Sequence, residues 1–201
     1  MTDKPIFQVK EGRTLIRVSH QNENITFVAP YFGPAHYDEV GNQIDRAGLL
    51  RPTFAETVSL VYSAIENKDN KYAKQVLGIL NDGYNFWGFN KIKYNPKVGV
   101  WISDRNRKNV HVPFELKTGK NSFNELVVLA LAEGEEGVEK LVKITKSLKK
   151  KSYDWSFDLE NVDSTEYNRV ASLESHDRAI YCGRYCNCDG GCAYGILPKG
   201  R

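Results

Sequence analysis

Thiol chemistry is the first possibility that this sequence raises. All four cysteines lie in the stretch YCGRYCNCDGGC, Tyr181 to Cys192, and no other part of the 201-residue chain contains one. Structural zinc sites usually take two ligands from each of two separate knuckles, with two to four residues inside a knuckle. Here Asn187 alone separates Cys186 from Cys188, and no second knuckle follows. The spacing therefore fits a zinc site poorly.

The neighbouring residues give the other thiol reactions little support. A disulfide from Cys182 to Cys192 would close a loop too short to stabilise the fold by much. A nucleophilic cysteine needs a positioned base, and His176 is the only histidine nearby. His176 and Asp177 could instead serve as additional metal ligands. We predict no catalytic residue, no metal and no cofactor. The alternative is a small metal-binding or thiol-redox domain that uses Cys182, Cys186, Cys188 and Cys192. The remaining histidines are predicted to be polar residues of loops or strands (His20, His36 and His111).

The residue types around the cysteines carry a clearer signal than the cysteines themselves. From Ser175 to Tyr194 the chain reads SHDRAIYCGRYCNCDGGCAY and lacks Lys, Glu, Gln, Met and Trp, which together supply 40 of the 201 residues. A window of this length would lack all five types about once in a hundred tries, so the bias is informative. The same five types cannot arise when the adenines of an Asn codon (adenine-adenine-pyrimidine) are replaced by any base. The run therefore looks like the product of adenine-directed mutagenesis.

The strands that must position this run are predicted from alternating apolar residues and turn signals. A strand or hairpin is expected at 6–18, around a turn at Gly12. A hairpin is expected at 88–104, turning at Asn95-Pro96-Lys97, and a short strand at 109–116. Segment 25–35 should begin as a strand and break at its prolines, and 36–50 should be a loop. The chain after residue 152 should consist of short strands and loops.

Helices are predicted from capping boxes and apolar stripes. Thr53 and Glu56 form one capping box, and Ser122 and Glu125 form another. Further helices are expected at 71–81 and, after a break at Gly134, over EEGVEKLVKITKSLKKK. The lysines of the last helix are predicted to form a solvated face above a buried apolar one (Lys140, Lys143, Lys146 and Lys149 to Lys151, above Val138, Leu141, Val142 and Leu148). The aromatic cluster Phe86, Trp87 and Phe89 is expected in the core.

The composition indicates one α+β domain over residues 1–201. Hydrophobic residues make up 41% of the chain, and the net charge is only +3, which does not point to nucleic acid. No apolar run reaches the length of a signal peptide or of a membrane span. We therefore expect a soluble protein without membrane insertion.

Two stretches together resemble the variable proteins of diversity-generating retroelements, in particular their archaeal or archaeal-virus members. LLRPTFAETVSLVYSA, Leu49–Ala64, is similar to the Arg-Leu-Pro-Thr-x-x-Glu helix start of those proteins. NRVASLESHDRAIYCGRYCNCDGGCAYGILP, Asn168–Pro198, is similar to their C-terminal variable region, with AYGILP in place of the usual closing strand. The chain departs from the family in having ASLES at 171–175 where relatives have GGSW.

The resemblance implies a C-type lectin fold, with mixed and antiparallel sheets, several helices and paired N- and C-terminal strands, here 6–18 against 193–198. It implies a non-enzymatic, ligand-binding display protein that is hypervariable over about 168–198 and recognises a protein or cell-surface ligand. The formylglycine-generating oxidases share this fold, but their catalytic cysteine arrangement is missing here, so their activity is not implied. Location on a virion or cell surface, through a partner, is compatible with the family. The side chains expected to face solvent and contact the ligand are Ser175, His176, Asp177, Tyr181, Cys182, Gly183, Tyr185, Cys186, Asn187, Cys188, Asp189, Gly190, Cys192 and Tyr194.

Overall fold

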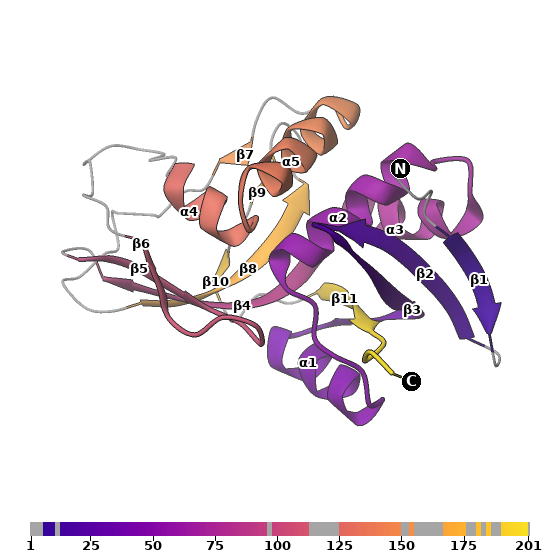
Figure 1. Ribbon diagram of the computed structural model, residues 1–201, viewed down its shortest axis with the longest axis horizontal. Coiled ribbons are helices and arrows are strands. Elements are labelled where there is room, and N and C mark those ends of the chain that lie inside the picture. Colours follow the sequence, from indigo (N-terminus) through magenta and orange to yellow (C-terminus); the bar gives the residue numbers. More distant parts are fainter. Residues whose placement is uncertain are drawn as a thin grey trace.

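A computed structural model describes residues 6–10, 13–95, 98–112, 125–149, 153–154, 167–175, 180–181, 184–185 and 190–200. These residues form a mixed α+β structure in which α-helices pack on a mixed β-sheet (Figure 1). The predicted fold class is confirmed at this level. Within the described part of the chain, no helix has both the length and the apolar character that a membrane span requires.

The sheet begins with the meander β1 (Ile6–Lys10), β2 (Arg13–His20) and β3 (Glu23–Ala35). β11 (Gly191–Ile196) lies between β3, to which it is antiparallel, and β4 (Asn85–Asn95), to which it is parallel. On the other side of β4 follows β8 (Tyr167–Ser175), and the hairpin partner β5 (Gly99–Ser103) links β4 to β6 (Val110–Val112). The predicted hairpin at 88–104 is thus confirmed, and the segment predicted as a strand or hairpin at 6–18 is a hairpin. The described part of the predicted strand 109–116 is β6.

The predicted pairing of 6–18 with 193–198 is wrong. β3 separates the two segments, because β2 pairs with one edge of β3 and β11 pairs with the other. β3 was also expected to break at its prolines, yet it runs through both of them. Pairing with β2 ends at Ala29, and the register against β11 shifts beyond that point. Pro30 and Pro34 therefore lie where the strand has no regular ladder of backbone hydrogen bonds, so the N–H that proline lacks is not needed there.

Residues 36–50 contain a helix, α1 (Tyr37–Arg46), where a loop was expected. Tyr37, Val40 and Ile44 recur at helical spacing and are buried. Acidic residues occupy the first turn and Arg46 the last, which complements the helix dipole. Gly41 was taken as a break, but it is a packing contact: a Cβ there would lie 2.7 Å from the guanidinium carbon of Arg51.

The helix after Thr53 begins where its capping box predicts, and the remaining helices lie within the predicted ranges. Ser122 of the second predicted capping box lies outside the described residues. α2 (Phe54–Glu66) carries the complete capping box of Thr53 and Glu56, and α3 (Lys71–Asn81) follows it. α4 (Glu125–Leu131) and α5 (Glu135–Ser147) are separated near Gly134, whose φ is +108°. The predicted solvated lysine face is wrong at Lys140, which is buried and donates to the Oγ of Ser59 over 3.1 Å.

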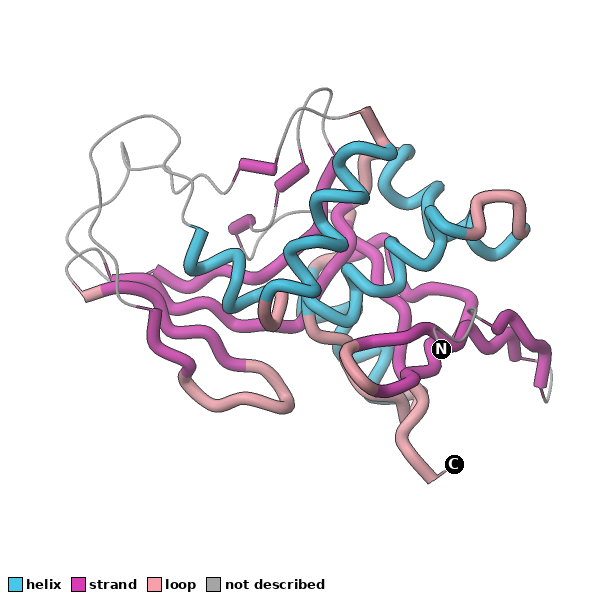
Figure 2. The backbone as a smooth tube through the Cα atoms, turned by 45° about the horizontal axis from the view of Figure 1, so that its top comes forward, coloured by secondary structure: helices cyan, strands magenta, loops and turns pink. Residues whose placement is uncertain are grey.

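Two apolar cores lie on opposite faces of the sheet. α2, α3, α4 and α5 gather on one face, whereas α1 lies alone on the other (Figure 1), and Figure 2 shows most of the helical segments over one side of the strands. The larger core includes Phe27, Phe54 and Phe86, and the smaller one includes Trp87 and Phe89. β11 runs between the two cores, and all six of its residues are buried.

Candidate functional site

The middle of the biased run lies along one edge of β8. β9 (Ile180–Tyr181) pairs antiparallel with Ser175 and Glu174, and β10 (Arg184–Tyr185) pairs antiparallel with Val170 and Arg169. The other edge of β8 pairs with β4, and the two-residue strand β7 (Tyr153–Asp154) runs parallel to β9. The structure therefore brings Ser175, Tyr181 and Tyr185 to one border of the sheet.

Eight of the predicted site residues fall outside the described part of the chain. They are His176, Asp177, Cys182, Gly183, Cys186, Asn187, Cys188 and Asp189. Their predicted role as ligand contacts therefore stays a prediction.

Cys192 and Tyr194 do not face solvent, so the prediction of exposure is wrong for them. Their exposed fractions are 0% and 1%, and both point into the larger core. The ring of Tyr194 packs edge-on against Tyr31, with centroids 6.0 Å apart, and at 5.9 Å against Phe86. Burial raises the pKa of the Cys192 thiol to about 11 and the pKa of Tyr194 still further. Both side chains are buried because β11 lies in the middle of the sheet, where alternate side chains of a strand enter the cores on its two faces.

The start of β11 is fixed by a close backbone contact. A Cβ at position 191 would lie 1.9 Å from the indole Nε1 of Trp87, so only glycine fits there. The indole N–H in turn donates to the carbonyl of Ala35 over 3.4 Å. A run of freely varied side chains must therefore end before Gly191, although the compositional bias continues to Tyr194.

The N-terminus of α2 is a polar junction between the helices and the sheet. The carboxylate of Glu56 accepts from the N–H of Thr53 over 2.7 Å and forms an ion pair with Arg105. Asn90 accepts from the N–H of Phe54 over 2.6 Å and donates to Asp104 over 2.8 Å. The capping box signalled this junction in the sequence.

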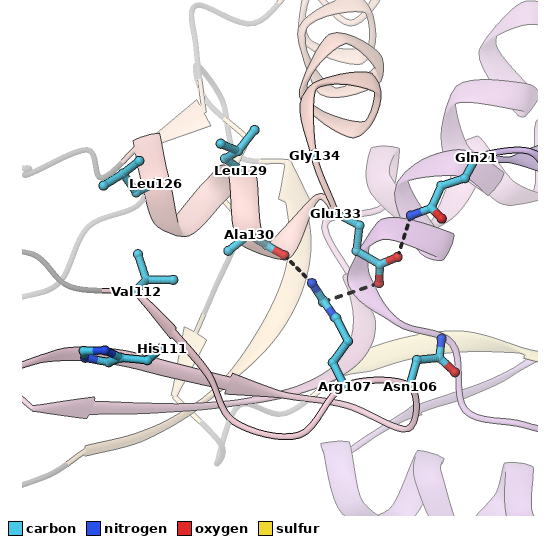
Figure 3. A pocket seen from close by; sticks show the side chains of 10 residues that line it. All are labelled: Gln21, Asn106, Arg107, His111, Val112, Leu126, Leu129, Ala130, Glu133 and Gly134. Carbon is cyan, nitrogen blue, oxygen red and sulfur yellow. Dashed lines mark hydrogen bonds and ion pairs between the residues drawn. The ribbon is translucent and has the colours of Figure 1, made fainter.

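A second polar cluster borders an open cavity of about 710 Å³ between α4, the 104–112 segment and the β2–β3 turn (Figure 3). Glu133 receives a hydrogen bond from the Nε2 of Gln21 over 2.9 Å and lies 3.4 Å from the guanidinium of Arg107. Arg107 also donates to the carbonyl of Ala130 over 2.7 Å. Opposite these charges the wall of the cavity is apolar, with Leu126 and Leu129 exposed.

Glu133 is also part of a Ser–His–Glu sequence of contacts that could suggest a catalytic triad. His20 Nδ1 lies 3.0 Å from the Oγ of Ser59, and His20 Nε2 lies 3.5 Å from the Oε2 of Glu133. A nucleophile must reach its substrate, however, and Ser59 is 1% exposed in the middle of α2. Its Oγ also accepts from the Nζ of Lys140. The cluster is thus suited to joining β2, α2 and α5 and not to attacking a substrate.

A third site is a cavity of about 290 Å³ on the α1 side of the sheet. Its floor contains Tyr37 and Phe89, whose ring centroids are 4.7 Å apart. Its rim carries the cationic side chains of Arg51, Lys91 and Arg105. The arrangement combines an apolar base with donors suited to an anion.

Sequence reasoning missed most of the residues that build these three clusters. Among the polar ones are Asn90, Asp104, Arg105 and Arg107, which come from one turn and one strand and have no spacing motif. The run of four charged or amide residues, Asp104-Arg105-Asn106-Arg107, was the available signal.

Comparison of the chain with protein-family models, with curated proteins and with solved structures gives no match.

Proposed function

We propose that this chain is a ligand-binding display protein of the kind found with diversity-generating retroelements, on a scaffold related to the C-type lectin fold. The observation that carries the proposal is the biased run from Ser175, in which the five residue types unreachable from mutated Asn codons are all missing. The run has the place expected of a variable region, just before a C-terminal closing strand. Its described strands β9 and β10 pair with the border of the sheet.

The arrangement of the fixed elements supports the scaffold. The closing strand β11 pairs with β3, so a C-terminal strand lies beside one from the N-terminal third of the chain, although β3 is the third strand and not the first. The Arg51-Pro52-Thr53-x-x-Glu56 motif begins α2 and anchors it to the sheet, because the N–H of Phe89 donates to the carbonyl of Pro52 over 2.7 Å. A scaffold with a core on each face can hold a varied border without losing its fold.

The ligand contacts lie in the part of the run before Gly191. Cys192 and Tyr194 belong to the scaffold, because changing a buried side chain freely would cost several kcal/mol, on the order of 2–5. The contacts are then drawn from Ser175 to Gly190. The run contains two tyrosines and two glycines, Tyr181, Tyr185, Gly183 and Gly190, and antibody loops likewise combine rigid aromatics with adaptable small residues.

The alternative of a four-cysteine metal or thiol-redox site loses support. A metal ligand or reactive thiol must ionise, whereas Cys192 faces a core of apolar side chains that raises its pKa. Stoichiometric zinc in the purified protein, or unfolding on addition of a chelator, would favour this alternative over the display function.

The proposal is tested with two libraries of the full chain. One randomises Cys182, Gly183 and residues 186–189, and its matched control randomises the six residues 191–196 of β11. We expect most members of the first library to be folded and protease-resistant, and few members of the second. Equal losses in both libraries would contradict the proposal.

The coding DNA offers a second test. A near-identical repeat downstream of the gene, differing almost only at adenines and accompanied by a reverse-transcriptase gene, is the expected arrangement. Its absence would count strongly against the retroelement.

A further inference from the structure

The α1 side of the sheet holds a small cavity with more cations than accessible anions. Arg51, Lys91 and Arg105 line it together with Ser103 and the aromatic floor of Tyr37 and Phe89. Asp104 also borders the cavity, but its side chain is fully buried. The carboxylate of Asp104 accepts instead from the guanidinium of Arg107 over 2.7 Å, so its charge is neutralised behind the wall.

Arg51 is held in place by its neighbours in α1. Its Nε and Nη2 donate to the carboxylate of Asp45 over 3.1 and 2.6 Å, and Nη2 also donates to Asn42 over 3.2 Å. Its guanidinium carbon lies 5.4 Å from the centre of the Phe89 ring. The absence of a side chain at Gly41 leaves room for the guanidinium against the helix. A cation fixed in this way loses little conformational entropy when it binds a ligand.

Arg105 is fixed by the junction at the start of α2. It forms an ion pair with Glu56, and it also donates to the carbonyl of Arg51. The side chain of Glu56 is only 3% exposed, whereas that of Arg105 is 26% exposed. The carboxylate thus lies behind the guanidinium, and the cavity meets the positive partner of the pair.

Lys91 supplies a positive charge that, unlike those of Arg51 and Arg105, is not paired with a carboxylate in the described part of the chain. It is exposed, and among the residues that the structure describes no carboxylate forms an ion pair with it. Lys91 pairs across the sheet with Ser103, so a hydroxyl lies on the neighbouring strand at the same level. Ammonium, guanidinium and hydroxyl donors around one hollow are suited to an oxyanion.

We propose that this cavity binds a carboxylate or phosphate group carried on an apolar or planar stem that rests against Tyr37 and Phe89. A volume of about 290 Å³ admits one such group and not an extended chain. Lys91 pairs with Val170, which pairs in turn with Arg184 of the biased run. Given the proposed display function, the cavity would be a fixed anchor beside the varied part of the binding face.

The test uses the full chain, labelled with ¹⁵N, and three small compounds. Benzoate and phenyl phosphate carry the two oxyanions, and benzamide is the neutral control. We expect saturable shifts in the amides of residues 89–91 and 103–105 with at least one of the anions and not with benzamide. The tighter of the two anions identifies whether carboxylate or phosphate is preferred.

A matched pair of variants assigns the effect to the cavity. Lys91→Gln should weaken binding of the preferred anion by about fivefold, as loss of one charge–charge contact would. Lys74→Gln, which removes an exposed lysine of α3 on the opposite side of the sheet, should leave binding unchanged. No saturable shift, equal shifts with benzamide, or equal binding by Lys91→Gln and the parent would overturn the anion site. Because these compounds do not depend on the library results, the anion site and the display function can fail separately.

Discussion

Gly191 rests directly on the indole ring of Trp87, with space for no side chain between the two residues. We predict that Gly191→Ala lowers the free energy of unfolding by about 1–3 kcal/mol, because the new methyl group must displace Trp87 or the strand. Gly78→Ala is the control, since a Cβ there has no neighbour within 4 Å. That change, inside α3, should stabilise the protein by about 0.5–1 kcal/mol. Urea unfolding of both variants checks the pair, and equal stability would contradict the packing described.

Cys192 should make the stability fall at alkaline pH. Its pKa is about 11 in the folded protein, against an ordinary value of 9.0. Between these two values the unfolded chain releases the thiol proton and the folded chain keeps it, so stability is complete below pH 9 and declines toward pH 11. Free energies of unfolding at pH 8 and 10.5 should therefore differ more for the parent than for Cys192→Ala. Parallel pH dependences would show that the thiol is not buried.

The cysteines should divide into one structural residue and three that tolerate replacement. Replacing Cys182, Cys186 and Cys188 together by Ser should change the melting temperature little if they belong to a displayed run. Cys192→Ser should lower it by several degrees, about what a loss of 1–2 kcal/mol produces, because a hydroxyl enters an apolar core. A large drop in the triple variant would instead indicate that the other thiols are structural.

The ion pair between Glu56 and Arg105 should stabilise the start of α2 measurably. Glu56→Gln should cost about 2 kcal/mol, because Arg105 loses a charged acceptor and the Thr53 N–H loses a carboxylate. Glu66→Gln, at the exposed end of the same helix, should change stability by less than about 0.5 kcal/mol. Chemical unfolding compares the two, and a double-mutant cycle with Arg105→Gln should give a favourable coupling energy. Additive losses would mean that the two side chains do not interact.

Protonation of Glu133 should lower the stability of the folded protein at acid pH. Its burial alone would raise the pKa of the carboxyl, but the hydrogen bond from His20 and the charge of Arg107 outweigh it and lower the pKa below 4.5. The ionised Glu133 therefore stabilises the folded protein above the pKa that it has in the unfolded chain, and this stabilisation is lost as the pH falls below about 4.5. The difference in unfolding free energy between pH 7 and pH 4 should be larger for the parent than for Glu133→Gln. Glu139→Gln, at an exposed position of α5, is the control and should resemble the parent.

Local chemistry in the sequence predicted the elements whose signals lie within a few neighbouring residues. The capping box of Thr53 and Glu56 marked the start of α2, and the turn at Asn95 marked the β4–β5 hairpin. The segment around Gly41 misled the prediction, because a glycine that admits the side chain of Arg51 cannot be told in sequence from one that ends a helix. The prolines of β3 were wrongly taken to end the strand for a similar reason, since only the pairing with β2 and β11 shows where β3 donates no backbone hydrogen bond.

By itself the sequence determined the residue types available in the run from Ser175 to Tyr194, which is a property of composition and codons. Only the tertiary structure decided which of those residues a scaffold could let vary. Gly191, Cys192 and Tyr194 share the bias of the run, yet β11 lies between two cores and fixes all three. The cationic cavity was likewise invisible in sequence, because Arg51, Lys91 and Arg105 meet only when a loop, a strand and a turn are packed together. Burial and proximity depend on contacts between distant segments, and no local pattern of residues encodes them.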